Sequence, residues 1–188
     1  LYTNSTGSNN VAMGRNALSG ATTASGNTAL GYFAMGTGGT TGGNNTAVGY
    51  YAGEDITTGN TNSFMGFEAG RSVTTGSWNV AIGGESLETN TGGSGNIAIG
   101  HDALRYYSGN YNVAVGFQAM SASSSTGANN TAVGYHALQA NTDGTNNVAV
   151  GYEALDSNTG GDNNTVVGYG ALSSNTTFGN HTAVGYGA

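Results

Sequence analysis

Asn130-Thr131-Ala132-Val133-Gly134 is one copy of the five-residue phrase that decides the fold, because this phrase returns through the whole chain. It usually reads Asn, then Thr or Val, then Ala, an aliphatic residue and Gly. The first copy is Asn10-Val11-Ala12-Met13-Gly14, and the eleventh, at 181–185, begins with His in place of Asn. Successive closing glycines are 16 to 18 residues apart. A period of this size, carried from end to end, predicts a stacked solenoid rather than a globule.

Two columns of the repeat hold nearly one residue type each, when positions are counted from the closing glycine. An invariant glycine indicates a corner, where φ is positive or where a neighbouring segment leaves no room for a Cβ atom. The Asn at position −4 predicts an internal ladder, in which stacked amides hydrogen-bond along the pile. The glycine column is Gly14, Gly31, Gly49, Gly66, Gly83, Gly100, Gly116, Gly134, Gly151, Gly168 and Gly185, and the asparagine column is Asn10, Asn27, Asn45, Asn62, Asn79, Asn96, Asn112, Asn130, Asn147 and Asn164, with His181 in the last copy.

Positions −3 to −1 predict a strand, because −3 is mostly β-branched and −1 is always apolar. Side chains alternate across a strand, so −3 and −1 share one face and the alanine between them takes the other. We expect −3 and −1 to point inward and the alanine to point outward. Positions +1 to +4, as in Tyr152-Glu153-Ala154-Leu155, predict a second short strand. The remainder is rich in Thr, Ser, Asn and Gly, which is turn chemistry.

The predicted fold is all-β: a parallel β-solenoid of about eleven 17-residue coils, with two short strands per coil. It forms a single repeat domain over 1–188, a rod roughly 50 Å long if coils stack about 4.8 Å apart. Because the chain opens at Leu1 inside the repeat, we expect a segment of a longer fibre protein. Each coil offers few inward aliphatic side chains, so we expect identical rods to associate, preferably as a closed homotrimer. A monomeric solenoid with capped ends is the alternative.

Composition excludes several classes of function. Glycine is abundant (35 residues) and proline is absent, which rules out collagen and proline-rich linkers. The chain has no cysteine, and its only Lys or Arg residues are Arg15, Arg71 and Arg105. The net charge of −7 disfavours nucleic acid as a partner, since phosphates call for clustered basic residues. No apolar run approaches the ~20 residues of a membrane helix, so we expect no membrane insertion in this segment.

The repeat resembles a known family. Asn79-Val80-Ala81-Ile82-Gly83 and 96–100 are similar to the core motif of the left-handed parallel β-roll in the heads of YadA-type trimeric autotransporter adhesins. The longer phrase at 130–138 is similar to repeats in phage tail-fibre and bacterial surface proteins. The resemblance spans the chain. It implies a left-handed roll, a homotrimer, a location outside the cell, on its surface or on a virion, and a role in attachment. The period is longer here than in the adhesin heads.

Two further columns are candidate sites. Position +1 is often aromatic, and we expect these rings to stack or to contact another subunit, with a sugar-binding strip as the alternative. Position +2 carries three carboxylates in successive coils, which predicts either a solvated acidic column or a weak Ca²⁺ site. The aromatic candidates are Phe117, Tyr135, Tyr152, Tyr169 and Tyr186, preceded by Tyr32, Tyr50 and Phe67, and the carboxylates are Glu68, Glu85 and Asp102.

Nothing in the sequence predicts catalysis or a cofactor. His101, His136 and His181 fall on different columns, without the spacing of metal ligands. No cysteine nucleophile exists, and the glycine-rich loops lack the lysine of a phosphate loop.

The sequence therefore favours a structural or adhesive role: the shaft or head of an extracellular trimeric fibre, from a phage tail or a bacterial surface. Its partners would be further copies of itself and a glycan or protein of a host surface. The alternatives are a self-assembling extracellular filament without a ligand and, lower, an ice- or mineral-binding repeat protein. The last would need regular pairs of outward threonines, and the threonine-rich turns vary in register.

Overall fold

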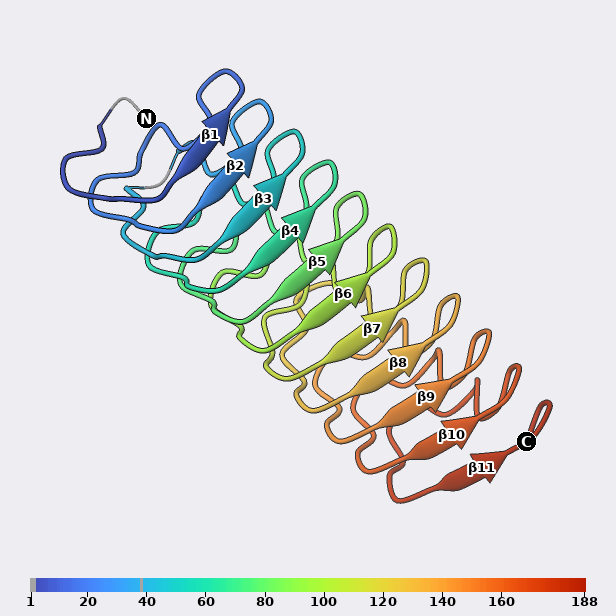
Figure 1. Cartoon of the computed structure of the whole chain (residues 1–188). Helices are drawn as coiled ribbons and strands as arrows, with labels where there is room; N and C mark the ends of the chain where they lie inside the picture. Colours follow the sequence, from blue (N-terminus) through green and yellow to red (C-terminus); the bar gives the residue numbers. More distant parts are fainter. Residues whose placement is uncertain (1–2, 38) are drawn as a thin grey trace.

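The fold is a single stack of coils, seen in a computed structural model that describes residues 3–37 and 39–188. All secondary structure in this part of the chain is β, and each of the eleven strands has three residues. The strands follow one another along the rod in chain order (Figure 1). They are β1 (Val11–Met13), β2 (Thr28–Leu30), β3 (Thr46–Val48), β4 (Ser63–Met65), β5 (Val80–Ile82), β6 (Ile97–Ile99), β7 (Val113–Val115), β8 (Thr131–Val133), β9 (Val148–Val150), β10 (Thr165–Val167) and β11 (Thr182–Val184).

The predicted parallel solenoid and its vertical registry are confirmed. Each strand pairs in parallel with the next, and every pair sets like positions opposite each other. Between β8 and β9, for example, Ala132 lies opposite Ala149 and Val133 lies opposite Val150. The result is an eleven-stranded sheet in which each repeat position forms a file along the rod.

The expectation of two strands per coil is wrong: the described residues hold one strand per coil. Positions +1 to +4 form a turn instead, because +2 and +4 adopt positive φ, as at His136 (54°) and Leu138 (55°). Alternate residues in this region cannot be extended. The turns still bond from coil to coil, since the Leu138 N–H donates to the Ala154 carbonyl at 3.0 Å. They therefore stack as regularly as the strands do.

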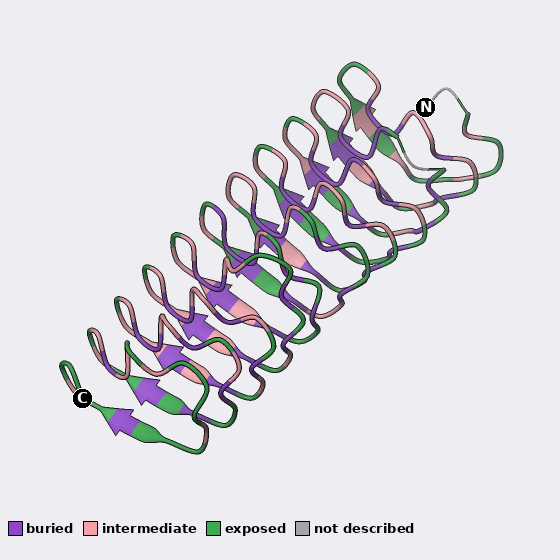
Figure 2. Cartoon of the chain, turned by 180° about the vertical axis from the view of Figure 1, so that it is seen from behind, coloured by how far each residue is buried: buried purple, intermediate pink, exposed green. Residues whose placement is uncertain are grey.

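The predicted facing of the strands is also wrong. From β2 to β11 the central residues are buried, whereas positions −3 and −1 are exposed or half-buried. In β9, Ala149 is fully buried between the half-buried Val148 and Val150. Figure 2 shows the buried stripe that runs through successive strands. The reason is the shortness of the strand: in three alternating residues only the central one faces the narrow interior, so each coil takes one inward side chain there rather than two.

The core is a set of files that meet inside the coil. Alanines at −2 and +3 face Leu or Met at +4, and the Asn at −4 is buried beside them. Two coils carry a larger buried residue in place of the inner alanine: Val166 in β10 and, as the greater departure, Phe64 in β4. The +4 residues around it are Gly53 and Gly70, where an added Cβ would lie 2.8 and 2.6 Å from the Phe64 ring. The ring fills the volume that two missing leucines vacate.

The glycine column forms the corner that the sequence predicts. Its φ values run from 128° to 146°, a region that side chains disfavour. A Cβ on Gly134 would also collide with the backbone carbonyl of Gly151 in the next coil. Both reasons for glycine, the positive φ and the close approach, therefore apply at this corner.

Candidate interaction surfaces

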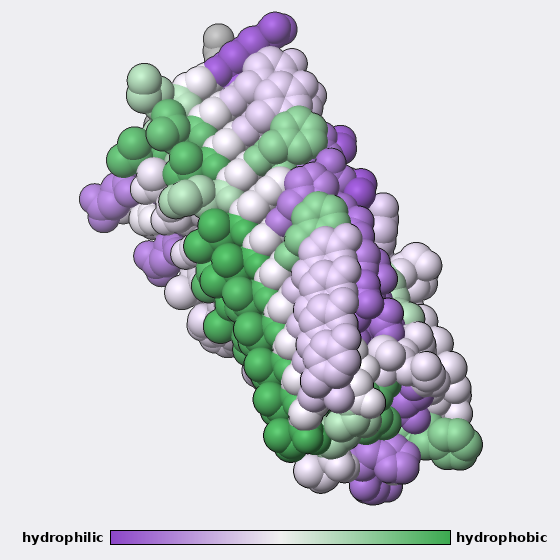
Figure 3. All heavy atoms as spheres, turned by 90° about the vertical axis from the view of Figure 1, so that its right-hand side faces the viewer, coloured by the Kyte–Doolittle hydropathy of each residue, from purple (hydrophilic) through white to green (hydrophobic). Residues whose placement is uncertain are grey.

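The outer face of the sheet is the largest apolar surface that the strands present. We call the file of position −1 residues the aliphatic strip, and its members are exposed or half-buried. Met13 and Val184, in the two end coils, are 68% and 70% exposed. Figure 3 shows the strip as a continuous hydrophobic file beside the glycine column. It consists of Met13, Leu30, Val48, Met65, Ile82, Ile99, Val115, Val133, Val150, Val167 and Val184.

The aromatic column borders the glycines on their other side (Figure 3). The rings from Phe117 to Tyr186 stack in sequence, with centroids 4.8 to 5.4 Å apart and planes within 8° of parallel. A second run joins Tyr32, Tyr50 and Phe67. Because each ring covers the face of the next, the column presents ring edges to solvent. Such edges are a poor surface for stacking a sugar, which needs an open ring face.

Two arginines hold the carboxylates of the +2 and +5 columns. The Arg71 guanidinium donates to Glu54 at 2.9 Å and to Glu68 at 3.3 Å. The hydrogen bond to Glu54 is the main cause that raises the pKa of Arg71. Arg105 pairs in the same way with Glu88 at 2.7 Å and also with two acids of the +2 column, Glu85 and Asp102. Three of these pairs join neighbouring coils: Arg71–Glu54, Arg105–Glu88 and Arg105–Glu85. The other two lie within one coil.

The calcium hypothesis assumes that the three carboxylates of the +2 column have no positive charge beside them, whereas each of them has an arginine partner. Glu68 is paired with Arg71, while Glu85 and Asp102 share Arg105. Within the described part of the chain, no group of three or more His, Asp or Glu side chains is placed to hold a metal ion.

The three histidines lie on different parts of the rod. His101 contacts Asp102 at 3.1 Å, and a ring nitrogen of His136 lies 2.9 Å from the Gln118 Oε1. The backbone N–H of His181 donates to Asn164 in the asparagine file. The structure does not bring the three imidazoles together.

The asparagine column forms a buried ladder whose main partners are backbone groups. The Asn147 N–H donates to the Oδ1 of Asn130 at 2.9 Å, and the Asn130 Nδ2 donates to the Gly144 carbonyl at 2.9 Å. Each amide thus joins its own coil to the strand and the turn of the next. Amide-to-amide bonds occur in some pairs, such as Asn164 to Asn147 at 3.0 Å. The buried amides of the asparagine column are therefore satisfied by hydrogen bonds.

A second internal polar file was not anticipated from the sequence. Asn141, Asn158 and Asn175 occupy position +7, and the Asn158 Nδ2 donates to the Oδ1 of Asn141 at 3.0 Å. Tyr107 enters the same file, and its hydroxyl accepts from the Asn141 Nδ2 at 2.7 Å. Burial raises the pKa of the Tyr107 phenol, so it stays neutral. The recurring Asn-Thr pairs at 141–142, 158–159 and 175–176 are the sequence signal of this file.

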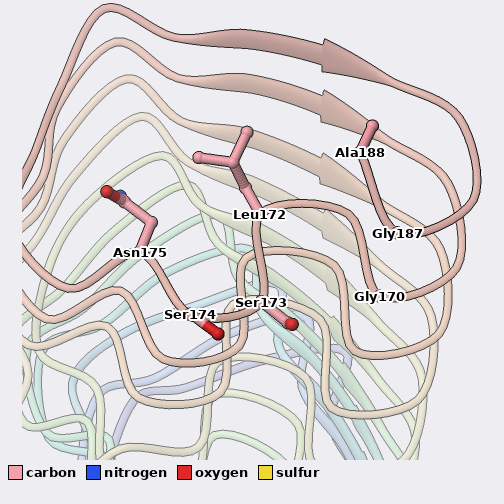
Figure 4. A pocket seen from close by; sticks show the side chains of 7 residues that line it. All are labelled: Gly170, Leu172, Ser173, Ser174, Asn175, Gly187 and Ala188. Atoms are coloured by element: carbon pink, nitrogen blue, oxygen red, sulfur yellow. The ribbon is translucent and has the colours of Figure 1, made fainter.

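A hollow of about 330 Å³ lies at the turn of the last coil (Figure 4). It is lined by Gly170, Leu172, Ser173, Ser174, Asn175, Gly187 and Ala188. None of these side chains titrates near neutral pH, so the lining offers no acid, base or charged group for catalysis.

Comparison of the chain with protein-family models, with curated proteins and with solved structures found no match in any of the three. Among the described residues, no helix has the length and apolar character needed to cross a membrane. The fold and the surfaces described above come from the structure itself.

Proposed function

We propose that this chain is the structural and adhesive shaft of an extracellular fibre, in which identical copies pack through the outer faces of their sheets. The observation that carries the proposal is the aliphatic strip, which continues over all eleven coils without a charged residue. An apolar surface of this length on a folded chain marks an interaction site. At about 4.8 Å per coil the strip is roughly 50 Å long.

A second copy is the partner that best fits the strip. Its aliphatic side chains recur with the same axial spacing, so rows of two rods pack together along their whole length. Position −3 widens the surface with Thr, Val and Ile, and it also lacks charge. A closed threefold arrangement covers the strip of every chain, whereas a pairwise head-to-tail contact continues into an open filament. The resemblance to the left-handed rolls of YadA-like heads favours three chains.

The mechanical role follows from the ladders. Backbone bonds between coils, asparagine amides inside and arginine–carboxylate pairs outside all run along the rod axis. Pulling on the rod therefore loads many bonds at once. A stiff rod of this kind holds a tip away from a surface and presents its flank to a host or substrate. The location that suits it is extracellular, on a cell surface or a virion.

The ice-binding alternative gains no support from the outer face. Such a surface calls for paired threonine files, and threonine occurs at −3 in only some coils, such as Thr131 and Thr165, and nowhere at −1. The strip is aliphatic, which suits contact with another chain better than contact with ordered water.

Single cysteines test the proposed packing, because the chain has none of its own. Val148→Cys and Val150→Cys place a thiol on the outer face, and Thr159→Cys places one in an exposed turn as the matched control. Under mild oxidation we expect disulfide-linked chains from at least one outer-face variant and none from Thr159→Cys. Equal absence of crosslinks in all three variants would contradict packing through the sheet.

A further inference from the structure

Two aromatic residues occupy a turn position that asparagine or glycine fills in most coils. This position, −5, carries Trp78 in the turn before β5 and Tyr111 in the turn before β7. Both have φ of 58°, in the left-handed region. Asparagine and glycine adopt this conformation readily, whereas bulky side chains rarely do. Asn stands there at Asn9, Asn44, Asn129, Asn146, Asn163 and Asn180, all with positive φ. The two aromatic residues therefore stand where the turn favours asparagine or glycine.

Packing does not explain the two aromatic side chains. Trp78 is 65% exposed and Tyr111 is 63% exposed. Neither ring is stacked on another ring in the described part of the chain, in contrast to the +1 column. Among the described residues, no other ring covers the outward face of Trp78 or Tyr111, whereas each tyrosine inside the +1 column is covered by its neighbours.

A glycine stands between the two aromatic residues, and the Tyr111 ring lies over it. Gly95 holds position −5 in the coil of β6, between the coils of Trp78 and Tyr111. A Cβ at Gly95 would lie 2.6 Å from the Tyr111 Cδ1, so the ring lies against bare backbone. The two turns are two coils apart, about 10 Å along the rod. They lie on the same side of the stack (Figure 1).

A row of small polar side chains runs beside the rings, at position −6. The Ser77 Oγ accepts the Asn60 N–H at 3.0 Å, and the Ser94 Oγ accepts the Ser77 N–H at 3.1 Å. Because each hydroxyl accepts from backbone, its own O–H is left to donate outward. The Asn110 Oδ1 accepts the Ser94 N–H, which orients its NH₂ group as a further donor.

The surroundings also lack charge. No Asp, Glu, Lys or Arg occurs in the turns at 57–61, 74–78, 91–95 and 108–111. Ring faces match the C–H faces of a pyranose, and neutral hydroxyl and amide groups match its hydroxyls. A protein partner would instead need a matching row of hydrogen-bond acceptors to satisfy these donors. The chemistry therefore selects a neutral, polyhydroxylated ligand.

We propose that Trp78 and Tyr111 form a platform that binds an uncharged oligosaccharide along the rod axis. This inference rests on the proposed attachment role and gives that role a site and a ligand class. Two sugar rings would stack on the two aromatic faces, with the serines and Asn110 bonding the hydroxyls between them.

Trp78 is the chain's only tryptophan, so its fluorescence reports directly on this platform. The assay is a screen of neutral and acidic oligosaccharides on an array, followed by titration of the bound ones against Trp78 emission. We expect neutral oligosaccharides to bind and to shift the emission. Trp78→Asn should weaken array binding at least tenfold and Tyr111→Asn by a similar factor, because Asn suits the backbone at this position. Phe178→Asn is the matched control, since that ring is also exposed, and it should bind as the parent chain does.

Three results would overturn the platform. In the first, no neutral oligosaccharide binds. In the second, oligosaccharides bind equally well to Trp78→Asn and Tyr111→Asn. In the third, Trp78→Asn lowers the mass of the assembly in solution, which would make the rings a subunit contact. The cysteine crosslinks test the packing of chains separately from oligosaccharide binding. Loss of the platform would therefore not contradict the proposed packing, and absence of crosslinks would not contradict the platform.

Discussion

The two faces of each strand obey different rules. In β9 the inner face is Ala149, fully buried, and the outer face is Val148 and Val150, half-buried. The smallest side chain is inside and the larger apolar ones are outside, the reverse of an ordinary globular protein. The inner face is limited by volume, because the coil is narrow. The outer face has no neighbouring layer within the described part of the chain. Under the proposed packing, the side chains of the inner face contact the same chain and those of the outer face contact another copy.

The largest expected effect separates the faces directly. Ala149→Asp would place a carboxylate without a partner in the narrow interior, so we expect a loss of more than about 3 kcal/mol in the free energy of unfolding. That loss lowers the melting temperature by roughly 10 °C or more. Val150→Asp, one residue later and outward, should leave the solenoid of a single chain nearly as stable. Melting curves of both variants in dilute solution, where chains are separate, check this; a Val150→Asp chain that unfolds as readily as Ala149→Asp would restore the inward assignment of valine.

A large effect is also expected where the inner face breaks its own pattern. Phe64→Ala removes a buried ring and leaves a cavity, for which we expect a loss of about 3–5 kcal/mol. Adding Gly53→Leu and Gly70→Leu restores the leucine that most other coils carry at +4. Gly53 and Gly70 have nearly the same positive φ as Leu138, so leucine fits their backbone conformation. The triple variant should regain most of the loss in chemical denaturation. If the two leucines lower the stability of Phe64→Ala further, the volume argument fails.

The smallest expected effect lies in the turn beyond Leu155, outside both faces. Burial raises the pKa of Asp156 in the folded chain above its unfolded value. The folded form then holds its proton more tightly, so this group's stabilising contribution is present at low pH and is lost as pH rises through the folded pKa. Asp156→Asn should therefore raise the melting temperature slightly near neutral pH and leave it unchanged in acid. An equal shift at both pH values would show that charge is not the cause.

Much of the fold was readable from the sequence, because the repeat fixes the register. The spacing of the closing glycines predicts the parallel stack, and Gly134, Gly151 and Gly168 are aligned in successive coils of the structure. The alternation around Ala149 predicted two opposite faces. It could not say which face is inside, since that depends on the width of the coil, and size was the wrong guide.

The conformation of positions +1 to +4 could not be predicted from residue types alone. Leucine at +4 is a strand or helix residue by propensity, yet Leu138 and Leu155 adopt positive φ because the core needs them there. This removed the predicted second strand. The arginine partners of Glu68 and Asp102 come from position +5, whose alternation of acid and base at 54, 71, 88 and 105 is visible in the sequence once the coils are aligned. Trp78 and Tyr111 have no periodic signal in the sequence, because aromatic residues occur at −5 in only these two coils.

The mass of the chain's assembly in solution tests the central claim most directly. The claim is that the outward valines are covered by identical copies. Native mass spectrometry of the 18.6 kDa chain should give a species of three chains, and Val150→Asp should give single, folded chains under the same conditions. A parent chain that stays single at every concentration, with its aliphatic strip open to water, would contradict the account.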